Sequence, residues 1–234
     1  GIFGDGKELA QIALAKVFRH GDFRAGYYRD QALMTALGQY SPKHMFSALY
    51  GDPELEREPS SGSRQMMNHF GTRFLNDDGS WKNLMEQNNS TSDMACLASQ
   101  FPRLVGLAQA SQVYRDNPEL AKSKPGFTNG GSEIAFATIG NSSCAEGHFF
   151  EAVNAIGVLQ VPAIISIWDD GYGISVANDI QMTKSDVSEV LKGFQMDEKG
   201  AGYDIVKVMA WDYPALISAY EKAEKLAREK HIPS

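Results

Sequence analysis

Two apolar runs flank a helical pattern near the middle of the chain, in residues 133–174. Residues 134–139 are apolar enough to form a buried strand, and a second apolar run, residues 163–167, follows Pro162. Between the two runs, apolar side chains recur at helical spacing: Phe149, Phe150, Val153, Ile156 and Leu159. A strand, a helix and a strand within about 35 residues predict a βαβ unit with parallel strands. The chain is therefore expected to be an α/β protein.

The same reasoning predicts further elements on both sides of this unit. Helices are expected over residues 8–20, from about 31 to 37, 42–50, 104–113, 187–194 and 214–230. Residues 22–27 should be extended, residues 204–209 should form an apolar strand, and residues 122–131 and 199–203 should be turns. Residues 51–90 are rich in Gly, Pro, Ser, Asp and Asn without periodicity, which indicates a long loop. Residues 4–8 suit a phosphate or a helix start equally, and we interpret them as a helix start.

Two polar turns follow the predicted strands of the βαβ unit, at residues 140–147 and 168–173. In a parallel sheet, both turns lie at the carboxyl edge, where ligands bind. The first offers backbone N–H groups, hydroxyls and a helix N-terminus, all suited to a phosphate. Asn141, Asp170 and a backbone carbonyl near Tyr172 offer the hard oxygen ligands with which proteins hold magnesium beside phosphate. An ordinary α/β crossover with solvated polar turns explains the same pattern equally well.

Composition mainly excludes some function classes. The chain has 234 residues, 43% of them hydrophobic and 22% charged, which fits one soluble α/β domain. Its net charge of −7 argues against nucleic acid or an anionic membrane as the main partner, and no apolar run is long enough for a membrane span. No signal peptide is visible, and Cys96 and Cys144 have no metal-ligand spacing and give no disulfide framework. A cytoplasmic setting is therefore the simplest interpretation.

The two polar turns resemble the thiamine diphosphate signature of the 2-oxo acid dehydrogenase alpha subunits. That signature is Gly-Asp-Gly and, after a long gap, Asn-Asn. Here it is Gly140-Asn141-Ser142 and, after residues 143–168, Asp169-Asp170. Residues 145–152 and 171–175 are also similar to the family. An amide and a carboxylate have exchanged places at 141 and 170, and each still offers an oxygen, so the resemblance implies Asp170 as the anionic magnesium ligand and Asn141 as the neutral one.

The resemblance follows one order along nearly the whole chain. Residues 26–31 contain Tyr28-Arg29, similar to the pair that contacts the cofactor diphosphate; from sequence alone, a surface ion pair of Arg29 with Asp30 is the simpler interpretation. Residues 64–70 resemble the family stretch Arg-Gln-Met-Pro-x-His-Phe, with methionine at 67 where the family has proline. In this stretch His69 either lines the substrate or cofactor entrance, as a candidate catalytic residue, or packs within the loop.

Residues 96–102 resemble the family stretch Pro-Leu-Ala-Thr-Gln-Ile-Pro, with Cys96 for proline and Ser99 for threonine. In the family this segment touches the cofactor and can hold a structural potassium ion. The resemblance therefore implies three groups: thiamine diphosphate, magnesium and, in addition, potassium. The implied cofactor-binding residues are Tyr28, Arg29, Leu97, Gly140, Asn141, Ser142, Ser143, Trp168, Asp170 and Tyr172. The implied magnesium ligands are Asn141, Asp170 and the Tyr172 carbonyl.

The resemblance is strongest to alpha subunits of the branched-chain type, or to the alpha-like half of a fused alpha–beta chain. It implies a three-layer α/β/α sandwich with a mainly parallel sheet, the diphosphate-binding domain, over residues 1–234, truncated at one or both ends. The reaction implied is oxidative decarboxylation of a 2-oxo acid, either a branched-chain 2-oxo acid or pyruvate, with acyl transfer to a lipoyl carrier.

The glutamate that activates the aminopyrimidine in this family comes from the beta subunit, and no residue here takes that role. We therefore expect a chain that is inactive without a beta-type pyrimidine-binding subunit or domain. Its other expected partners are a lipoyl-bearing acyltransferase and a small 2-oxo acid. A degenerate, non-catalytic assembly domain is the alternative, because the residues at 141 and 170 are exchanged. A Rossmann-like nucleotide-binding domain is a weaker alternative, since no Gly-x-Gly-x-x-Gly follows an early strand.

Overall fold

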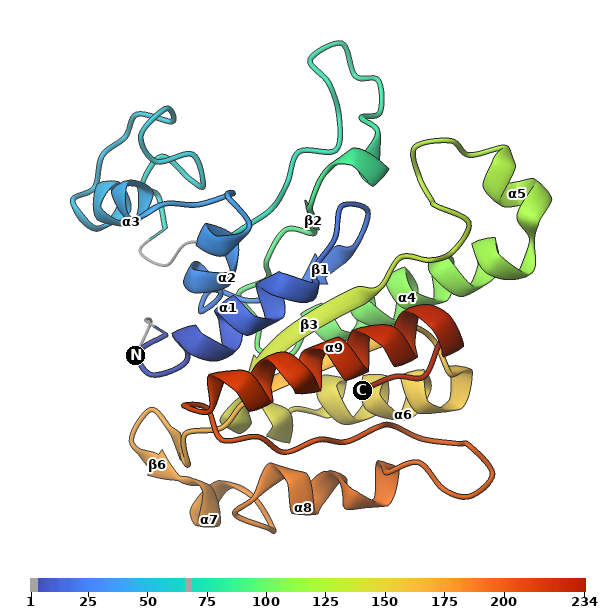
Figure 1. The fold of residues 1–234 in the computed structure, drawn as a ribbon. Helices are drawn as coiled ribbons and strands as arrows, with labels where there is room; N and C mark the ends of the chain where they lie inside the picture. Colours follow the sequence, from blue (N-terminus) through green and yellow to red (C-terminus); the bar gives the residue numbers. More distant parts are fainter. Residues whose placement is uncertain (1–3, 66–68) are drawn as a thin grey trace.

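The computed structural model describes residues 4–65 and 69–234, and a four-stranded parallel sheet runs through this part of the chain (Figure 1). Its strands are β1 (Phe23–Ala25), β2 (Asn89–Ser90), β3 (Ala135–Gly140) and β4 (Ala163–Trp168), in the order β2-β1-β3-β4. β3 and β4 pair in parallel from Ala135 opposite Ala163 to Gly140 opposite Trp168. The helix α6 (Gly147–Leu159) connects them, so the predicted βαβ unit is confirmed.

Eight further helices are described, and six of them agree with the predicted pattern, with ends that differ by a few residues. The eight are α1 (Glu8–Val17), α2 (Gln31–Ala36), α3 (Pro42–Leu49), α4 (Gln100–Asp116), α5 (Pro118–Lys122), α7 (Asn178–Gln181), α8 (Val187–Leu191) and α9 (Tyr213–Lys230). The sequence did not predict β2, α5, α7 or the small hairpin of β5 (Tyr172–Gly173) and β6 (Val176–Ala177), because these elements are too short to show a period. Across the described ranges, no helix combines the length and apolar character needed to cross a bilayer.

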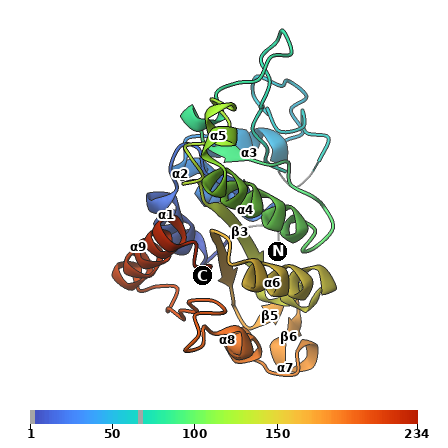
Figure 2. The same cartoon turned by 90° about the vertical axis from the view of Figure 1, so that its right-hand side faces the viewer.

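Helices cover both faces of the sheet, which confirms the predicted three-layer α/β/α arrangement (Figure 2). α4 and α6 pack on one face through a buried cluster that includes Phe101, Phe149 and Ile139. α1 and α9 pack on the other face through a second cluster that includes Leu14 and Phe136. Successive side chains of β3 therefore enter different clusters, as the period of two in a strand requires. Burial on both faces explains why this strand is a continuous apolar run in the sequence.

The predicted strand at residues 204–209 is wrong. The Asp204 N–H donates to the Pro233 carbonyl at 2.9 Å, but within the described chain residues 205–209 form no ladder. The edge of β4 bonds instead to Ser234, which donates to the Ala163 carbonyl and accepts from the Ile165 N–H. A cavity of about 690 Å³ lies between β4, residues 203–211 and α9. An apolar run becomes a strand only beside another strand, and none of the described strands lies next to this one.

The long loop predicted for residues 51–90 is largely confirmed. Its described parts stand away from the sheet in Figure 1, and it ends in a short 3-10 turn, η1 (Leu84–Glu86), and in β2. β2 pairs in parallel with β1, from Phe23 opposite Asn89 to Arg24 opposite Ser90. The loop therefore returns to the edge of the sheet beside the turn that follows β1.

Candidate functional site

Three chain turns meet at the carboxyl edge of the sheet. They follow β1, β3 and β4, which are neighbours in the strand order, and Gly140 at the end of β3 is paired with Trp168 at the end of β4. A methyl group added to Gly140 would lie 3.2 Å from Arg29 Nη1 and 3.6 Å from the Tyr27 hydroxyl. Gly140 is thus a close-approach position, and the turn that carries Arg29 lies directly against it.

Arg29 is held between two tyrosines. Its guanidinium carbon lies 5.7 Å from the ring centre of Tyr27 and 5.4 Å from that of Tyr28, and Nη1 donates to the Tyr27 hydroxyl at 3.4 Å. Burial works to lower the pKa of Arg29, but the two tyrosines and Asp170 raise it, so the side chain is a permanent cation at this edge. The alternative of a surface ion pair with Asp30 is wrong, because Asp30 is fully buried and pairs with Arg24.

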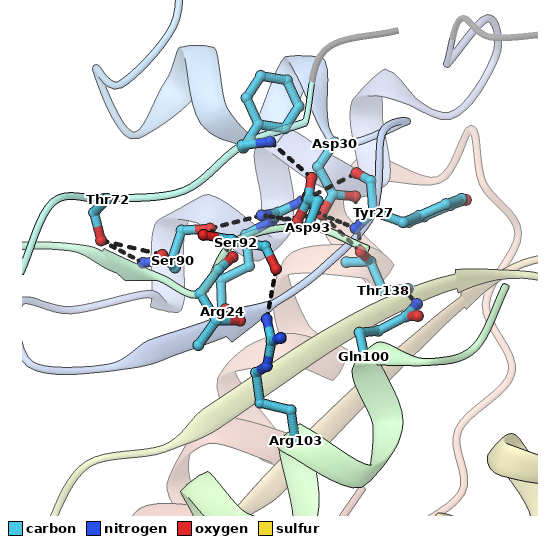
Figure 3. A network of polar contacts seen from close by, with 12 residues as sticks. Arg24, Tyr27, Asp30, Thr72, Ser90, Ser92, Asp93, Gln100, Arg103 and Thr138 are labelled. Carbon is cyan, nitrogen blue, oxygen red and sulfur yellow. Dashed lines mark hydrogen bonds and ion pairs between the residues drawn. The ribbon is translucent and has the colours of Figure 1, made fainter. Parts of the chain in front are cut away.

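Arg24 is the centre of a buried polar network that the sequence did not reveal (Figure 3). Its side chain is 1% exposed. Nε donates to Asp30 Oδ2 at 2.5 Å, and Nη1 donates to Asp93 Oδ1 at 2.8 Å and to Ser90 Oγ at 2.7 Å. Nη2 donates to the Tyr27 carbonyl at 3.0 Å. The buried guanidinium therefore holds the turn after β1 through its bonds to Asp30 and to the Tyr27 carbonyl.

The same network fixes the end of the long loop. Asp93 Oδ2 accepts from the Phe70 backbone N–H at 3.0 Å, and Asp30 accepts from the Thr138 hydroxyl of β3 at 2.7 Å. Burial is the main cause that raises the pKa of Asp30 to about 6, with Arg24 opposing it and the Asp93 charge adding to it. One cation and two carboxylates thus join β1, β3 and residues 70–93 beneath the site.

Asn141 and Asp170 both contact Tyr172. Asn141 is buried, and its Nδ2 donates to the Tyr172 carbonyl at 3.1 Å and to Asn178 Oδ1 at 2.6 Å. Asp170 Oδ1 accepts from the Tyr172 N–H at 3.0 Å, and its Oδ2 accepts from Lys7 Nζ at 2.6 Å. Burial works to raise the pKa of Asp170, but the bonds from Lys7 and Tyr172 and the charges of Lys7 and Arg29 outweigh it and lower the pKa.

The orientation of the Asn141 amide follows from its neighbours. Asn178 Nδ2 donates to Asp169 Oδ1 at 3.0 Å and to the Ser185 carbonyl at 2.9 Å, so Asn178 Oδ1 must be an acceptor. Asn141 therefore presents its N–H groups, rather than its oxygen, to Asn178 and to the Tyr172 carbonyl.

This arrangement does not fit the predicted magnesium site. The Asn141 amide occupies the carbonyl that would be the third ligand, and the Asp170 carboxylate is neutralised by an ammonium. Across residues 4–65 and 69–234, no three His, Cys, Asp or Glu side chains converge as metal ligands. The three predicted ligands are together, but they are bonded to one another and to Lys7.

Of the remaining predicted cofactor residues, four lie at the carboxyl edge of the sheet and one has a buried side chain. Tyr28, Leu97 and Ser143 line one small cavity at this edge, beside Cys96. Ser142 lies next to Gly173, where an added methyl group would be 1.7 Å from Ser142 Oγ. The Trp168 side chain, in contrast, is buried against Tyr27 and Leu216, so only its backbone reaches the edge of the sheet.

The structure gives the positions of His69 and of residues 96–102, the predicted potassium-binding segment, but assigns no role to either. His69 is half-buried and precedes Phe70, whose N–H is bound by Asp93. Both interpretations of His69 therefore stay open. Residues 96–102 reach the sheet through Gln100, whose Nε2 donates to the Thr138 carbonyl at 3.0 Å. Potassium binding there stays a prediction.

Comparison with known proteins agrees with the resemblance. The 2-oxoisovalerate dehydrogenase subunit alpha of Bacillus subtilis (strain 168) is 28% identical over 222 residues, which cover 94% of this chain and 56% of that protein. The mitochondrial subunits of the same name from Caenorhabditis elegans and Mus musculus are 24% and 23% identical, and the match covers 42% of each. The chain thus spans about half the length of these curated relatives. The family model described as dehydrogenase E1 component matches residues 2–234, and the chain belongs to that family.

Proposed function

We propose that this chain binds the diphosphate of thiamine diphosphate within an enzyme that oxidatively decarboxylates a 2-oxo acid. The observation that carries the proposal is the convergence of the Tyr28-Arg29 turn on Gly140 and the turn that follows it. The Arg29 guanidinium and the Ser143 hydroxyl are hydrogen-bond donors that suit a diphosphate, and Gly140 has no side chain to block its approach. The donors come from neighbouring strand ends, where parallel sheets bind ligands.

The bound cofactor would supply the carbanion chemistry, and this chain would supply position and charge. Arg29 would hold phosphate oxygens with parallel N–H donors, while Tyr27 and Tyr28 keep its guanidinium over their rings. Gly140 would let the backbone approach the diphosphate. Tyr28 and Leu97, which line the same small cavity, would exclude water from it.

The names of the relatives support the proposed substrate, and the family resemblance supports the proposed partners. Proteins named 2-oxoisovalerate dehydrogenase subunit alpha support a branched-chain 2-oxo acid as the substrate, with pyruvate as the other candidate. A beta-type subunit or domain would contribute the group that activates the aminopyrimidine, and a lipoyl-bearing acyltransferase would accept the acyl group. We expect no turnover by the pure chain and turnover when the beta-type partner is added.

Arg29→Ala tests the assignment directly. In calorimetric titration of the assembled enzyme with thiamine diphosphate, the variant should lose about 2 kcal/mol or more of binding free energy, since charge-assisted hydrogen bonds contribute roughly 1.5 to 3 kcal/mol. Arg73→Ala is the matched control, because Arg73 is a 67% exposed arginine paired with Asp77. Equal affinities of the two variants would show that Arg29 does not bind the cofactor.

A degenerate assembly domain is the second candidate function. It is favoured by one observation, the bonding of the predicted metal ligands to one another and to Lys7. A chain of this kind would form a complex with the beta-type partner and would bind no thiamine diphosphate in that complex. Binding of the cofactor to the complex with this chain, and not to the partner alone, excludes it.

A further inference from the structure

Lys7 reaches the candidate cofactor site from the other end of the chain. It is the N-cap residue of α1, in a turn where its N–H donates to the Gly4 carbonyl at 2.7 Å. Its Nζ lies 2.6 Å from Asp170 Oδ2, and its side chain is only 12% exposed whereas that of Asp170 is 49% exposed. Residues 4–8 are therefore more than a helix start, because they place a cation beside the turn that follows β4.

The Lys7 ammonium has donors to spare. An ammonium carries three N–H groups, and Asp170 accepts one of them. Of the other residues that the structure describes, none accepts a hydrogen bond from Lys7 Nζ. The two further N–H groups are thus available to a ligand at the exposed side of Asp170, and phosphate oxygens are acceptors that lysine commonly binds.

A second observation concerns the oxygens that would hold a divalent ion. The Asn141 N–H groups are directed at Asn178 Oδ1 and at the Tyr172 carbonyl, so the amide oxygen and the carbonyl do not converge on a common point. Both oxygens of Asp170 already accept hydrogen bonds, from Lys7 and from the Tyr172 N–H. The oxygens of Asp170 and the Tyr172 carbonyl thus have hydrogen-bond partners without a metal ion, and Lys7 supplies the positive charge that pairs with Asp170.

A divalent ion at a diphosphate site has two tasks, to bridge a protein carboxylate to phosphate oxygens and to neutralise their charge. An ammonium bound to Asp170 with free N–H groups performs the first task. Lys7 and Arg29 together supply the second, since both cations act on the Asp170 carboxylate from the N-terminal part of the chain.

We propose that Lys7 is a cofactor-binding residue that takes the place of the divalent metal ion, bridging Asp170 to the diphosphate. The inference rests on the proposed function, and it specifies how that function is performed here. Thiamine diphosphate then binds to this chain without Mg²⁺, and its affinity depends on the Lys7 ammonium.

The test is calorimetric titration of the full chain in complex with its beta-type partner, with thiamine diphosphate and, separately, with inorganic pyrophosphate, in excess EDTA and in Mg²⁺. The proteins are wild type, Lys7→Met, which keeps most of the aliphatic stem, and Lys122→Met as the matched control. Lys122 is an exposed lysine that pairs with Glu119 at 2.8 Å in α5. Melting curves by circular dichroism establish that each variant is folded.

We expect wild type and Lys122→Met to bind equally well in EDTA and in Mg²⁺. Lys7→Met should bind at least about tenfold more weakly in EDTA, as expected when one charge-assisted hydrogen bond is lost. Wild-type binding that disappears in EDTA and returns with Mg²⁺ would overturn the inference and leave the proposed function standing, and this comparison needs no variant to fold. Unchanged binding by Lys7→Met would also overturn it. Absence of binding to wild type in both conditions would overturn the proposed function, and the inference with it.

Discussion

Replacing Arg24 by methionine should strongly destabilise the protein, because it removes the cation of the buried network. Arg24 donates hydrogen bonds to two carboxylates, Asp30 and Asp93, and also to Ser90 Oγ and the Tyr27 carbonyl. The side chains of Asp30 and Asp93 are both fully buried. Methionine fills a similar volume but offers no donor, so both carboxylates would lose the group that compensates their burial.

The size of the effect follows from this geometry. Removing one partner of a buried ion pair commonly costs about 3 to 5 kcal/mol, since it leaves an uncompensated buried charge. In Arg24→Met the pKa of Asp30, already raised to about 6 by burial, should rise further. When folding raises the pKa of a carboxyl group, the folded protein loses stability as the pH rises through that pKa. The destabilisation caused by Arg24→Met should therefore be larger at about pH 8 than at about pH 5.

The assay is urea unfolding followed by circular dichroism at these two pH values, with Arg73→Met as the control. Arg73 lies 2.8 Å from Asp77 in a pair whose side chains are 67% and 91% exposed. Breaking such an exposed pair should cost less than about 1 kcal/mol. Asp30→Asn added to Arg24→Met should recover part of the loss, because it removes one of the two unpaired charges.

Two results would refute this reasoning. If Arg24→Met were no less stable than Arg73→Met, the network would not be a buried, mutually dependent unit. If the loss were the same at both pH values, the uncompensated carboxylates would not be its cause.

Two further predictions concern the same network. Asp30→Asn in the otherwise wild-type chain should gain stability relative to wild type as the pH rises from about 4 to about 7, by up to roughly 3 kcal/mol. The reason is that burial raises the pKa of Asp30 from 3.8 to about 6. A loss of stability relative to wild type over this pH range, measured by urea unfolding, would contradict this. Gly26→Ala should destabilise by about 1 to 3 kcal/mol or more, since its methyl group would lie 2.0 Å from Asp30 Oδ2 and 2.3 Å from Arg24 Cζ. Gly106→Ala, inside α4 with open space at the added methyl, is the control and should be neutral or stabilising by up to about 1 kcal/mol, and equal melting temperatures of the two variants would contradict the predicted clash.

Periodicity was sufficient to predict the βαβ unit and the polar edge. Strands buried on both faces are short apolar runs, and the helix between them has its own period, so β3, α6 and β4 could be predicted without knowledge of their neighbours. The polar turns follow from where those runs stop. The failure at residues 204–209 has the same origin, since an apolar run shows that a segment is suited to a strand but does not show whether a strand lies beside it.

Arg24 and Lys7 could not be identified in this way. In sequence, Arg24 is a charged residue between Phe23 and Ala25, which is typical of a strand with one solvated face. Its burial depends on Asp93, which is 69 positions away, and the Lys7 contact joins residues 163 positions apart. Neither pair shares a period, a motif or a composition signal, so only the fold brings its members together.

The order of the strands explains why charges that are far apart in the sequence meet at one edge of the sheet. β1 pairs with β3 although residues 26–134 separate them, and β3 pairs with β4. This order places two cations of the first 30 residues, Lys7 and Arg29, at the edge where the Gly140 and Asp170 turns lie. Asp30 pairs with Arg24, and Arg29 Nη1 lies 3.2 Å from the position of a methyl group added to Gly140. The buried network therefore supports the candidate site: Arg24 donates to the Tyr27 carbonyl and pairs with Asp30, the two residues that flank the Tyr28-Arg29 pair.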